Sequence, residues 1–290
     1  MKGAFQLGFL TEVLAHTTPQ EGAATKTYTI DAVYGTSVGA LMAPLIANED
    51  VATLKEVFDN IHTIADVVTY RHLLGVPITS PSLVAMYSLF QLGGYQSIKL
   101  VETLESRLTP EHRQVAEQKC HVVAYDMLRD QERWFTGTEL LQGVRCSSAL
   151  WLAVPPVAYD GSFFSDGGVT EIYPIDYIVE HELQDPTFDG LYVFVDCETR
   201  ESTPSTALPT NGLVMMNKLH SAASARLADF ELQKLSDKLG GKLVVVRPHT
   251  NFLHSALDVD KERMTQTYEA GREKGRAFLE MMSAKGKGEP

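Results

Sequence analysis

Basic residues are scarce in this chain of 290 residues. Lys and Arg total 25 against 37 Asp and Glu, which gives a formal net charge of −12. A general nucleic-acid-binding protein needs a basic surface to displace counterions from phosphates, so we expect no nucleic-acid partner. The acidic balance also gives no global attraction to anionic membranes, although a local basic patch would still supply one.

Cysteine is rare as well. Cys120, Cys146 and Cys197 lie far apart, and no CxxC pair occurs. We therefore expect neither a disulfide framework nor a cysteine zinc site. The pattern favours a reducing compartment, the cytoplasm. His181-Glu182 begins an HExxH pattern that Asp185 breaks, so no zinc helix is expected. The sequence therefore predicts neither a metal nor a cofactor.

Long apolar runs are missing too. No stretch is continuously apolar over the length of a transmembrane helix, so any membrane contact is expected to be peripheral. One uncharged segment stands out, because from Leu73 to Ile98 there is no charged residue and no histidine. Its prolines and glycines forbid a continuous helix. Two interpretations stay open: a core helix with its entry loops, or an apolar wall or lid beside an acyl-chain site.

The chain does hold 44% apolar residues, enough to bury one large core. Short apolar runs bounded by polar residues predict buried parallel strands, and helical patterns separate them. This alternation predicts one α/β domain. The predicted strands are 28–34, 121–125, 191–195 and 243–246; the predicted helices are 4–14, 38–47, 51–68 and 258–282, with a polar loop over 16–26 and a frayed tail over 284–290.

The pattern Gly35-Thr36-Ser37-Val38-Gly39 follows a predicted strand and opens a predicted helix. A nucleophile elbow needs this context, because a sharp strand-to-helix turn holds the serine in a strained backbone geometry. Small residues at Gly35 and Gly39 would let neighbouring backbones pack closely. The helix N-terminus would aim free N–H groups at developing negative charge. The pattern predicts a catalytic Ser37; the alternative is a glycine-rich turn in a Rossmann-like sheet.

A second segment, Ser165-Asp166-Gly167-Gly168-Val169, places an acidic residue before two glycines. Taken alone, it is an ordinary Asp-Gly turn. The late histidines His249 and His254 leave open a Ser-His-Asp esterase of the α/β-hydrolase type. Several strands normally precede the elbow in that fold, and only one fits before Ser37.

An early GxSxG, a Pro155-Pro156-Val157 segment and a downstream Asp-Gly-Gly together resemble the patatin-like phospholipase family. Lys2-Gly3-Ala4 and Gly8 look like the end of that family's Gly-Gly-x-Lys/Arg-Gly oxyanion loop and the helix that it opens. The resemblance covers most of the chain. It implies a three-layer α/β/α fold with a mostly parallel central sheet over residues 1–283, followed by a flexible tail over 284–290.

The resemblance also implies a serine carboxylic-ester hydrolase with a Ser–Asp dyad and no histidine, acting on phospholipid or another lipid ester. Ser37 would attack the ester carbonyl, while Asp166 would accept its proton and return it to the leaving alcohol. The ordinary pKa of an aspartate is ~3.9, so Asp166 would need partial desolvation and contact with the Ser37 hydroxyl. Gly167 and Gly168 would form the turn that supports Asp166.

The oxyanion donors that the resemblance implies are N–H groups near Lys2 and Gly3, and that of Val38. The family's glycine run would precede Lys2, so we expect the first strand and most of the glycine loop to be missing. Trp151 and Ile172 stand where the family has proline and asparagine, which concerns local turns only. The missing loop keeps a third possibility open, an inactive lipid-binding or scaffold protein of the same fold. The sequence predicts no oligomeric state.

Overall fold

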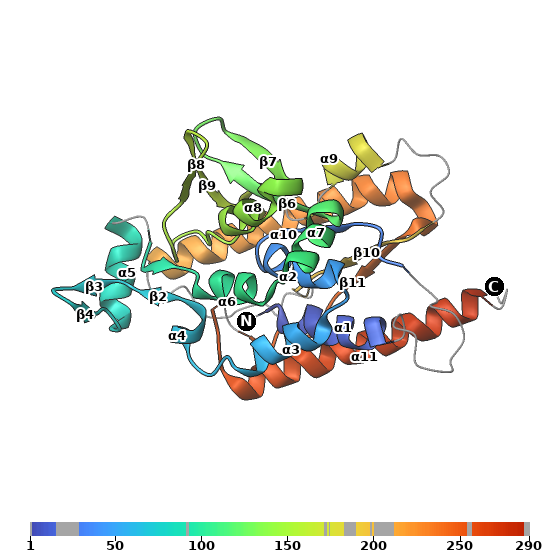
Figure 1. Ribbon diagram of the computed structural model, residues 1–290, viewed down its shortest axis with the longest axis horizontal. Helices are drawn as coiled ribbons and strands as arrows, with labels where there is room; N and C mark the ends of the chain where they lie inside the picture. Colours follow the sequence, from blue (N-terminus) through green and yellow to red (C-terminus); the bar gives the residue numbers. More distant parts are fainter. Residues whose placement is uncertain are drawn as a thin grey trace.

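The computed structural model (Figure 1) describes residues 2–15, 29–90, 93–170, 173, 175–182, 190–197, 199, 212–253 and 257–286. No helix in this part of the chain is both long enough and apolar enough to cross a membrane. The predicted loop over 16–26 lies outside the described residues.

The described strands form two parallel pairs and an antiparallel extension. β1 (Val33–Gly35) pairs with β6 (Cys120–Asp126) in parallel, and β10 (Tyr192–Val195) pairs with β11 (Leu243–Val246) in parallel. These helix-linked pairs confirm the predicted parallel sheet. Around β6 the sheet continues with antiparallel strands, which the sequence analysis did not separate: β7 (Gln131–Phe135), β8 (Val157–Tyr159) and β9 (Ser162–Asp166).

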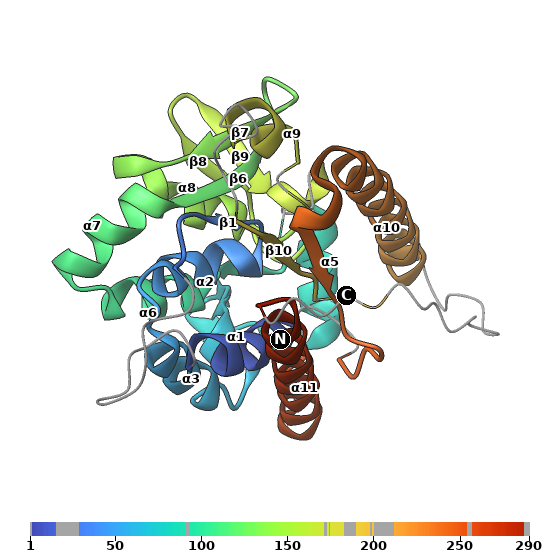
Figure 2. The ribbon, with the colours of Figure 1, turned by 90° about the vertical axis from the view of Figure 1, so that its right-hand side faces the viewer.

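Helices cover both faces of this sheet, which gives the three-layer α/β/α architecture (Figure 2). Neighbouring residues of a strand point to opposite faces. Val33 accordingly belongs to the large core beneath α2 (Val38–Ala47) and α8 (Leu140–Ser147). Tyr34 packs instead against the cluster of α9 (Ile175–Tyr177) and α10 (Gly212–Leu239) on the other face.

The strand predicted over 28–34 is too long, because residues 29–32 lie outside a strand and β1 begins at Val33. Several helices agree with the predicted periodicity, and two of them have different boundaries. The predicted helix over 51–68 is two helices, because Asn60 ends the first and a capping box of Thr63 with Asp66 begins the second. The last helix runs from Lys261 to Gly286, whereas the sequence predicted 258–282. The remaining helices are α1 (Ala4–Ala15), α3 (Val51–Asp59), α4 (Ile64–Val67), α6 (Lys99–Arg107), α7 (Pro110–Lys119) and α11 (Lys261–Gly286).

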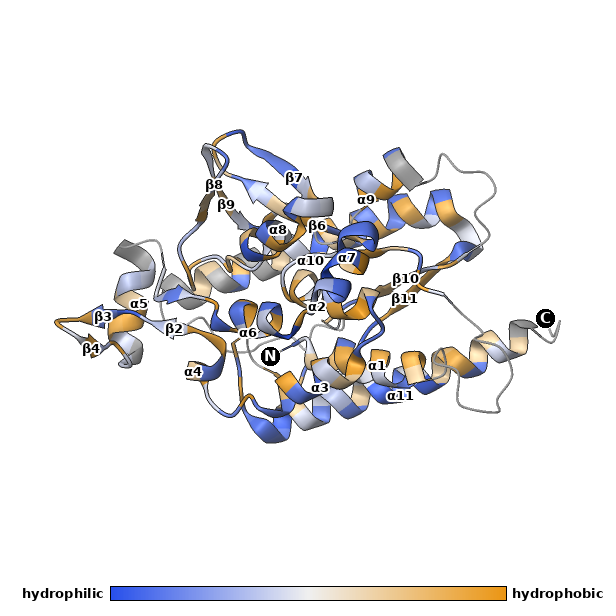
Figure 3. Ribbon diagram, in the orientation of Figure 1, coloured by the Kyte–Doolittle hydropathy of each residue, from blue (hydrophilic) through white to orange (hydrophobic). Residues whose placement is uncertain are grey.

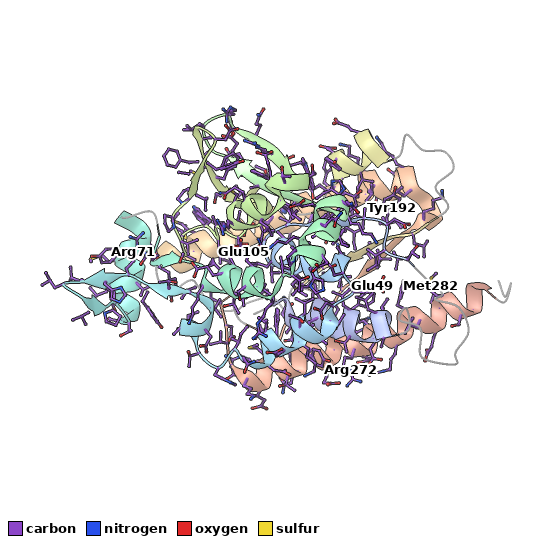
Figure 4. The ribbon with its side chains drawn as sticks, in the orientation of Figure 1. Glu49, Arg71, Glu105, Tyr192, Arg272 and Met282 are labelled. Carbon is purple, nitrogen blue, oxygen red and sulfur yellow. The ribbon has the colours of Figure 1, made fainter. Side chains whose placement is uncertain are left out.

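Helices α1 and α11 lie unusually close together along the lower edge of Figure 1. A Cβ added at Gly8 would lie 2.0 Å from the carbonyl oxygen of Tyr268, and one added at Gly271 would lie 2.0 Å from that of Phe5. Only glycine allows this backbone approach. Arg272, labelled in Figure 4, then reaches across to Glu12, with 2.6 Å between Nε and Oε1.

The uncharged segment forms a projection at the end of the molecule opposite the C-terminus (Figure 1). The residues just before the segment contribute to the same projection: β2 (Thr69–Tyr70) pairs with β5 (Tyr95–Ser97), and β3 (His72–Leu73) forms a hairpin with β4 (Val76–Pro77). The helix α5 (Pro81–Phe90) follows. Its Leu83 and Met86 are exposed, whereas Val84 and Tyr87 are half-buried and Ser88 is buried, so the interpretation of this segment as a core helix is wrong for Leu83 and Met86.

Candidate active site

Ser37 occupies a strained turn between β1 and α2. Its φ of 57° and ψ of −121° place a non-glycine residue in a sparsely populated backbone region, which costs on the order of 1–3 kcal/mol. The surrounding structure holds it there: Gly39 N donates to Thr36 O at 2.9 Å, and Ser37 N donates to the hydroxyl of Ser147 at 3.0 Å. The local geometry is that of a nucleophile elbow.

The two elbow glycines differ in what they do. A Cβ at Gly35 would lie 2.7 Å from the backbone nitrogen of Ala40, so the strand and helix can approach this closely only with glycine at that position. At Gly39 an added Cβ would meet nothing within 4 Å. The prediction that Gly39 allows close backbone packing is therefore wrong. Its side of the turn faces open space.

The start of α1 lies against the elbow. A Cβ at Gly3 would be only 2.6 Å from Cγ2 of Val38, so the structure brings these two predicted oxyanion residues together. Lys2 begins the first helical turn, since its carbonyl accepts from Phe5 N at 3.1 Å. Within the described part of the chain, the N–H of Val38 has no hydrogen-bond partner.

Strand β6 brings Asp166 to the elbow. Gly35 of β1 is in register with Val122 of β6, and Asp166 at the end of β9 is in register with Ala124 of the same strand. The elbow and the aspartate thus emerge from the two neighbours of one strand, although they are far apart in sequence. Asp166 N donates to Ala149 O at 3.0 Å, which fixes the end of β9.

The Asp166 carboxyl is buried, with 5% of the residue exposed. Burial raises its pKa from 3.8 to about 6, while the Ser37 hydroxyl and the Gly168 N–H lower it in part. Oδ1 accepts the Gly168 N–H at 2.9 Å. Oδ2 has no hydrogen-bond partner among the described residues. Catalytic pairs without substrate are commonly so arranged.

The two glycines after Asp166 have separate steric reasons. A Cβ at Gly167 would lie 2.5 Å from Val123 O, so this residue must be glycine for the turn to pack on β6. A Cβ at Gly168 would lie 3.2 Å from Asp166 Oδ1 and 3.8 Å from Cγ2 of Thr36. Gly168 therefore lies between the aspartate and the elbow, as a dyad-supporting turn requires.

Sequence reasoning missed Ser147 and Ala149, which hold the two halves of the site in place. Ser147 is fully buried and accepts the Ser37 N–H, while the Ala149 carbonyl accepts both Asp166 N and, at 3.2 Å, the hydroxyl of Ser165. The run of small residues over 146–149 was the only available signal. It does not reveal that one hydroxyl would serve as an acceptor, because the partner is 110 residues away.

The histidines of the alternative triad do not join this site in the described structure. His249 Nε2 lies 2.7 Å from Lys274 Nζ on α11, and His254 lies outside the described residues. Among the described residues, no histidine hydrogen-bonds to Ser37 or shifts the pKa of Asp166.

Two further buried carboxylates lie at strand ends and have structural partners. Asp126 accepts hydrogen bonds from Ser162 and, at 2.7 Å, from Arg129. Asp196 accepts one from Arg247 at 3.1 Å. Across the described ranges, no three His, Cys, Asp or Glu side chains gather in a way that would hold a metal ion.

Comparison with known proteins places the geometry in context. A family model described as "Patatin-like phospholipase" matches residues 1–179. Among curated proteins, no sequence matches the chain. A solved structure described as "Crystal structure of VipD from Legionella pneumophila" is 12% identical and gives a TM-score of 0.31, with 96% of this chain and 52% of that chain covered. The chain thus spans about half the length of that structure, and a TM-score this low supports no argument.

Proposed function

This chain belongs to the patatin-like phospholipase family, and we propose that it hydrolyses carboxylic esters of phospholipids or related lipids through Ser37 and Asp166. One observation carries the proposal. The strained Ser37 faces a buried aspartate whose pKa is raised to about 6, close to the operating range of a general base.

In the first step, Ser37 Oγ attacks the carbonyl carbon of the ester, and the Asp166 carboxylate takes the hydroxyl proton. The tetrahedral intermediate collapses as the carbon–oxygen bond to the alcohol breaks, and Asp166 returns the proton to that alcohol. The acyl group remains on Ser37. Oδ2 of Asp166 suits this exchange, because no described residue occupies it with a full hydrogen bond.

In the second step, a water molecule gives a proton to Asp166 and attacks the acyl carbon. The bond from that carbon to Ser37 Oγ then breaks, and the proton passes from Asp166 to the serine oxygen. The fatty acid leaves, and both side chains return to their starting states. No histidine is needed, since one buried carboxylate transfers every proton.

The Val38 N–H is the donor best placed to stabilise the oxyanion. It follows the nucleophile at the N-terminus of α2, where the helix dipole favours negative charge, and it has no partner in the described structure. Gly3 packs against Val38 and so places the backbone at the start of α1 beside the same spot. We propose that a backbone N–H at the start of α1 is the second hydrogen-bond donor to the oxyanion.

The test is turnover of a short-chain ester together with labelling by a fluorophosphonate. Ser37→Ala and Asp166→Asn are expected to lose at least about a thousandfold in kcat/KM. Ser148→Ala and Asp160→Asn are matched controls, a buried serine and an exposed aspartate of the β8–β9 hairpin, and they should retain activity. A folded chain whose Ser37 never labels would overturn the proposal in favour of an inactive lipid-binding protein.

A further inference from the structure

The hairpin of β3 and β4 exposes apolar side chains at the most projecting point of the molecule. We call Leu73, Leu74 and Val76 the apolar tip; all three are exposed, and Leu74 is 97% exposed. Leu83 and Met86 of α5 are exposed as well. Figure 3 shows hydrophobic colouring on β3, β4 and part of α5 at this end of the molecule. Exposed apolar surface grouped in this way marks an interaction site.

Leu74 is also in a conformation that leucine disfavours. The hairpin register pairs Leu73 with Val76, so Leu74 and Gly75 form a two-residue loop, with φ of 52° and 83°. Asparagine or glycine is the usual choice at the first of these positions. The Leu74 side chain packs against no other part of the protein, so it does not offset its backbone strain by burial. This favours a role in binding a partner.

The charge pattern of the segment that forms the projection suits an anionic lipid surface. From Val67 to Val101 the sequence contains no acidic residue, although the whole chain has a net charge of −12. The nearest charged residues on either side of the uncharged segment are Arg71 and Lys99. Figure 4 labels Arg71 at the base of the projection. Cations beside an apolar insertion favour anionic headgroups.

The projection is tied to the segment that holds the dyad. Its base donates two hydrogen bonds, from Gly94 N to Leu152 O at 3.2 Å and from Tyr95 N to Ala153 O at 2.7 Å. Three residues earlier, the Ala149 carbonyl holds Asp166. Between these contacts lies Trp151, 37% exposed, a residue type that prefers the boundary of a bilayer.

We propose that the apolar tip inserts into the surface of an anionic lipid bilayer and thereby brings the dyad to lipid esters at that surface. The inference rests on the proposed function, because hydrolysis of lipid esters is the reason for the chain to bind a bilayer. Its test measures vesicle binding and does not depend on turnover. The occupant is a lipid bilayer and not a second copy of this chain, because the tip is a two-residue turn, no acidic residue occurs between Val67 and Val101, and Arg71 lies on the same projection.

The experiment is flotation with vesicles of phosphatidylcholine alone and with about one third phosphatidylglycerol, using the full chain carrying Ser37→Ala. We expect binding to the anionic vesicles and a loss on the order of tenfold with Leu74→Asp. Leu128→Asp is the matched control: Leu128 is 64% exposed beside the β6–β7 turn, among charged neighbours, and its variant should bind normally. Leu74→Asn, which suits the positive φ, should weaken binding without lowering the melting temperature.

Three outcomes would overturn the inference: no binding of the parent chain to either vesicle, equal binding by the Leu74 variants, or a Leu74-dependent dimer in gel filtration with no effect on vesicles. In the chain with Ser37 intact, Leu74→Asp should leave turnover of a soluble short-chain ester unchanged and lower turnover on vesicles. Vesicle binding without any ester turnover would contradict the proposed function and leave the docking surface standing.

Discussion

The hydroxyl of Ser147 accepts a hydrogen bond from the backbone N–H of Ser37 at 3.0 Å. This contact satisfies a half-buried donor at the strained residue of the elbow. It also joins α8, which leads into the segment carrying Ala149, to the turn that carries the nucleophile. Ser147 therefore holds the nucleophile turn through the Ser37 backbone.

Ser147→Ala is expected to reduce kcat by roughly tenfold to a hundredfold, with a smaller effect on KM, because the nucleophile loses its alignment. Stability should fall by about 1 kcal/mol, since a half-buried N–H loses its partner. Steady-state kinetics and urea unfolding measure both. Ser148→Ala is the control, as its hydroxyl donates to Val144 O at 2.6 Å and not to the elbow. Equal effects of the two variants on kcat would rule out a positioning role for Ser147.

The pH dependence of ester hydrolysis should report the raised pKa of Asp166. The carboxylate must be ionised to accept the Ser37 proton, so kcat/KM should rise with pH through about 6 and level off above it. The measurement is a pH–rate profile with a soluble ester between pH 4 and 9. A profile that is already flat at pH 5 would show that the base titrates elsewhere.

Asp166→Asn should stabilise the fold at pH 7 even as it removes activity. Because burial raises the pKa of Asp166 from 3.8 to about 6, the fold favours the protonated form. Keeping Asp166 ionised in the folded state lowers the free energy of unfolding. This loss is absent below about pH 3.8, grows between pH 3.8 and 6, and is complete above about pH 6. Removing it should add up to roughly 3 kcal/mol at pH 7 and little at pH 4.

Asp126 provides the opposite case on the same strand pair. Burial would raise its pKa, but hydrogen bonds from Ser162, Arg129 and the backbone outweigh burial and lower it to about 2. Its contribution to stability is present above the unfolded pKa and is lost as pH falls toward 2. Asp126→Asn should therefore lower the urea midpoint at pH 7, where Asp166→Asn raises it. A shift of the same sign in both variants would contradict the two assignments.

Alanine at either glycine of the α1–α11 contact should separate the two helices. Gly8→Ala and Gly271→Ala each place a Cβ 2.0 Å from a backbone oxygen, so we expect a loss of at least about 2 kcal/mol. Gly241→Ala is the control, because an added Cβ there meets nothing within 4 Å. Thermal unfolding of the three variants makes the comparison, and equal melting temperatures would contradict the close contact.

The two elbow glycines should respond differently to alanine. Gly35→Ala forces β1 away from Ala40 and should abolish activity or prevent folding, whereas Gly39→Ala should fold normally because its Cβ enters open space. Circular dichroism and fluorophosphonate labelling distinguish the two. A Gly39→Ala chain that fails to fold would show that this glycine has a backbone role that the structure does not reveal.

Several features of the fold could be predicted from the sequence, because they depend only on neighbouring residues. The strand, elbow and helix around Ser37 lie within fifteen residues, so residue order alone specifies their geometry. The Asp-Gly-Gly turn is equally local, and the helices 4–14 and 38–47 follow from their apolar spacing. The antiparallel strands around β6 were not recognised, because short half-buried strands such as β8 carry too few residues for a clear alternation.

The sequence by itself determined the two turns that carry Ser37 and Asp166, since each depends on neighbouring residues and on glycines that avoid a steric clash. Only the tertiary structure decided that these turns meet across β6, that Ser147 supports the elbow, and that the uncharged segment projects outward instead of filling the core. Those outcomes depend on contacts between residues a hundred or more positions apart, and on which apolar side chains the finished fold leaves exposed. Neither these long-range contacts nor the exposure of these side chains can be read from a local stretch of sequence.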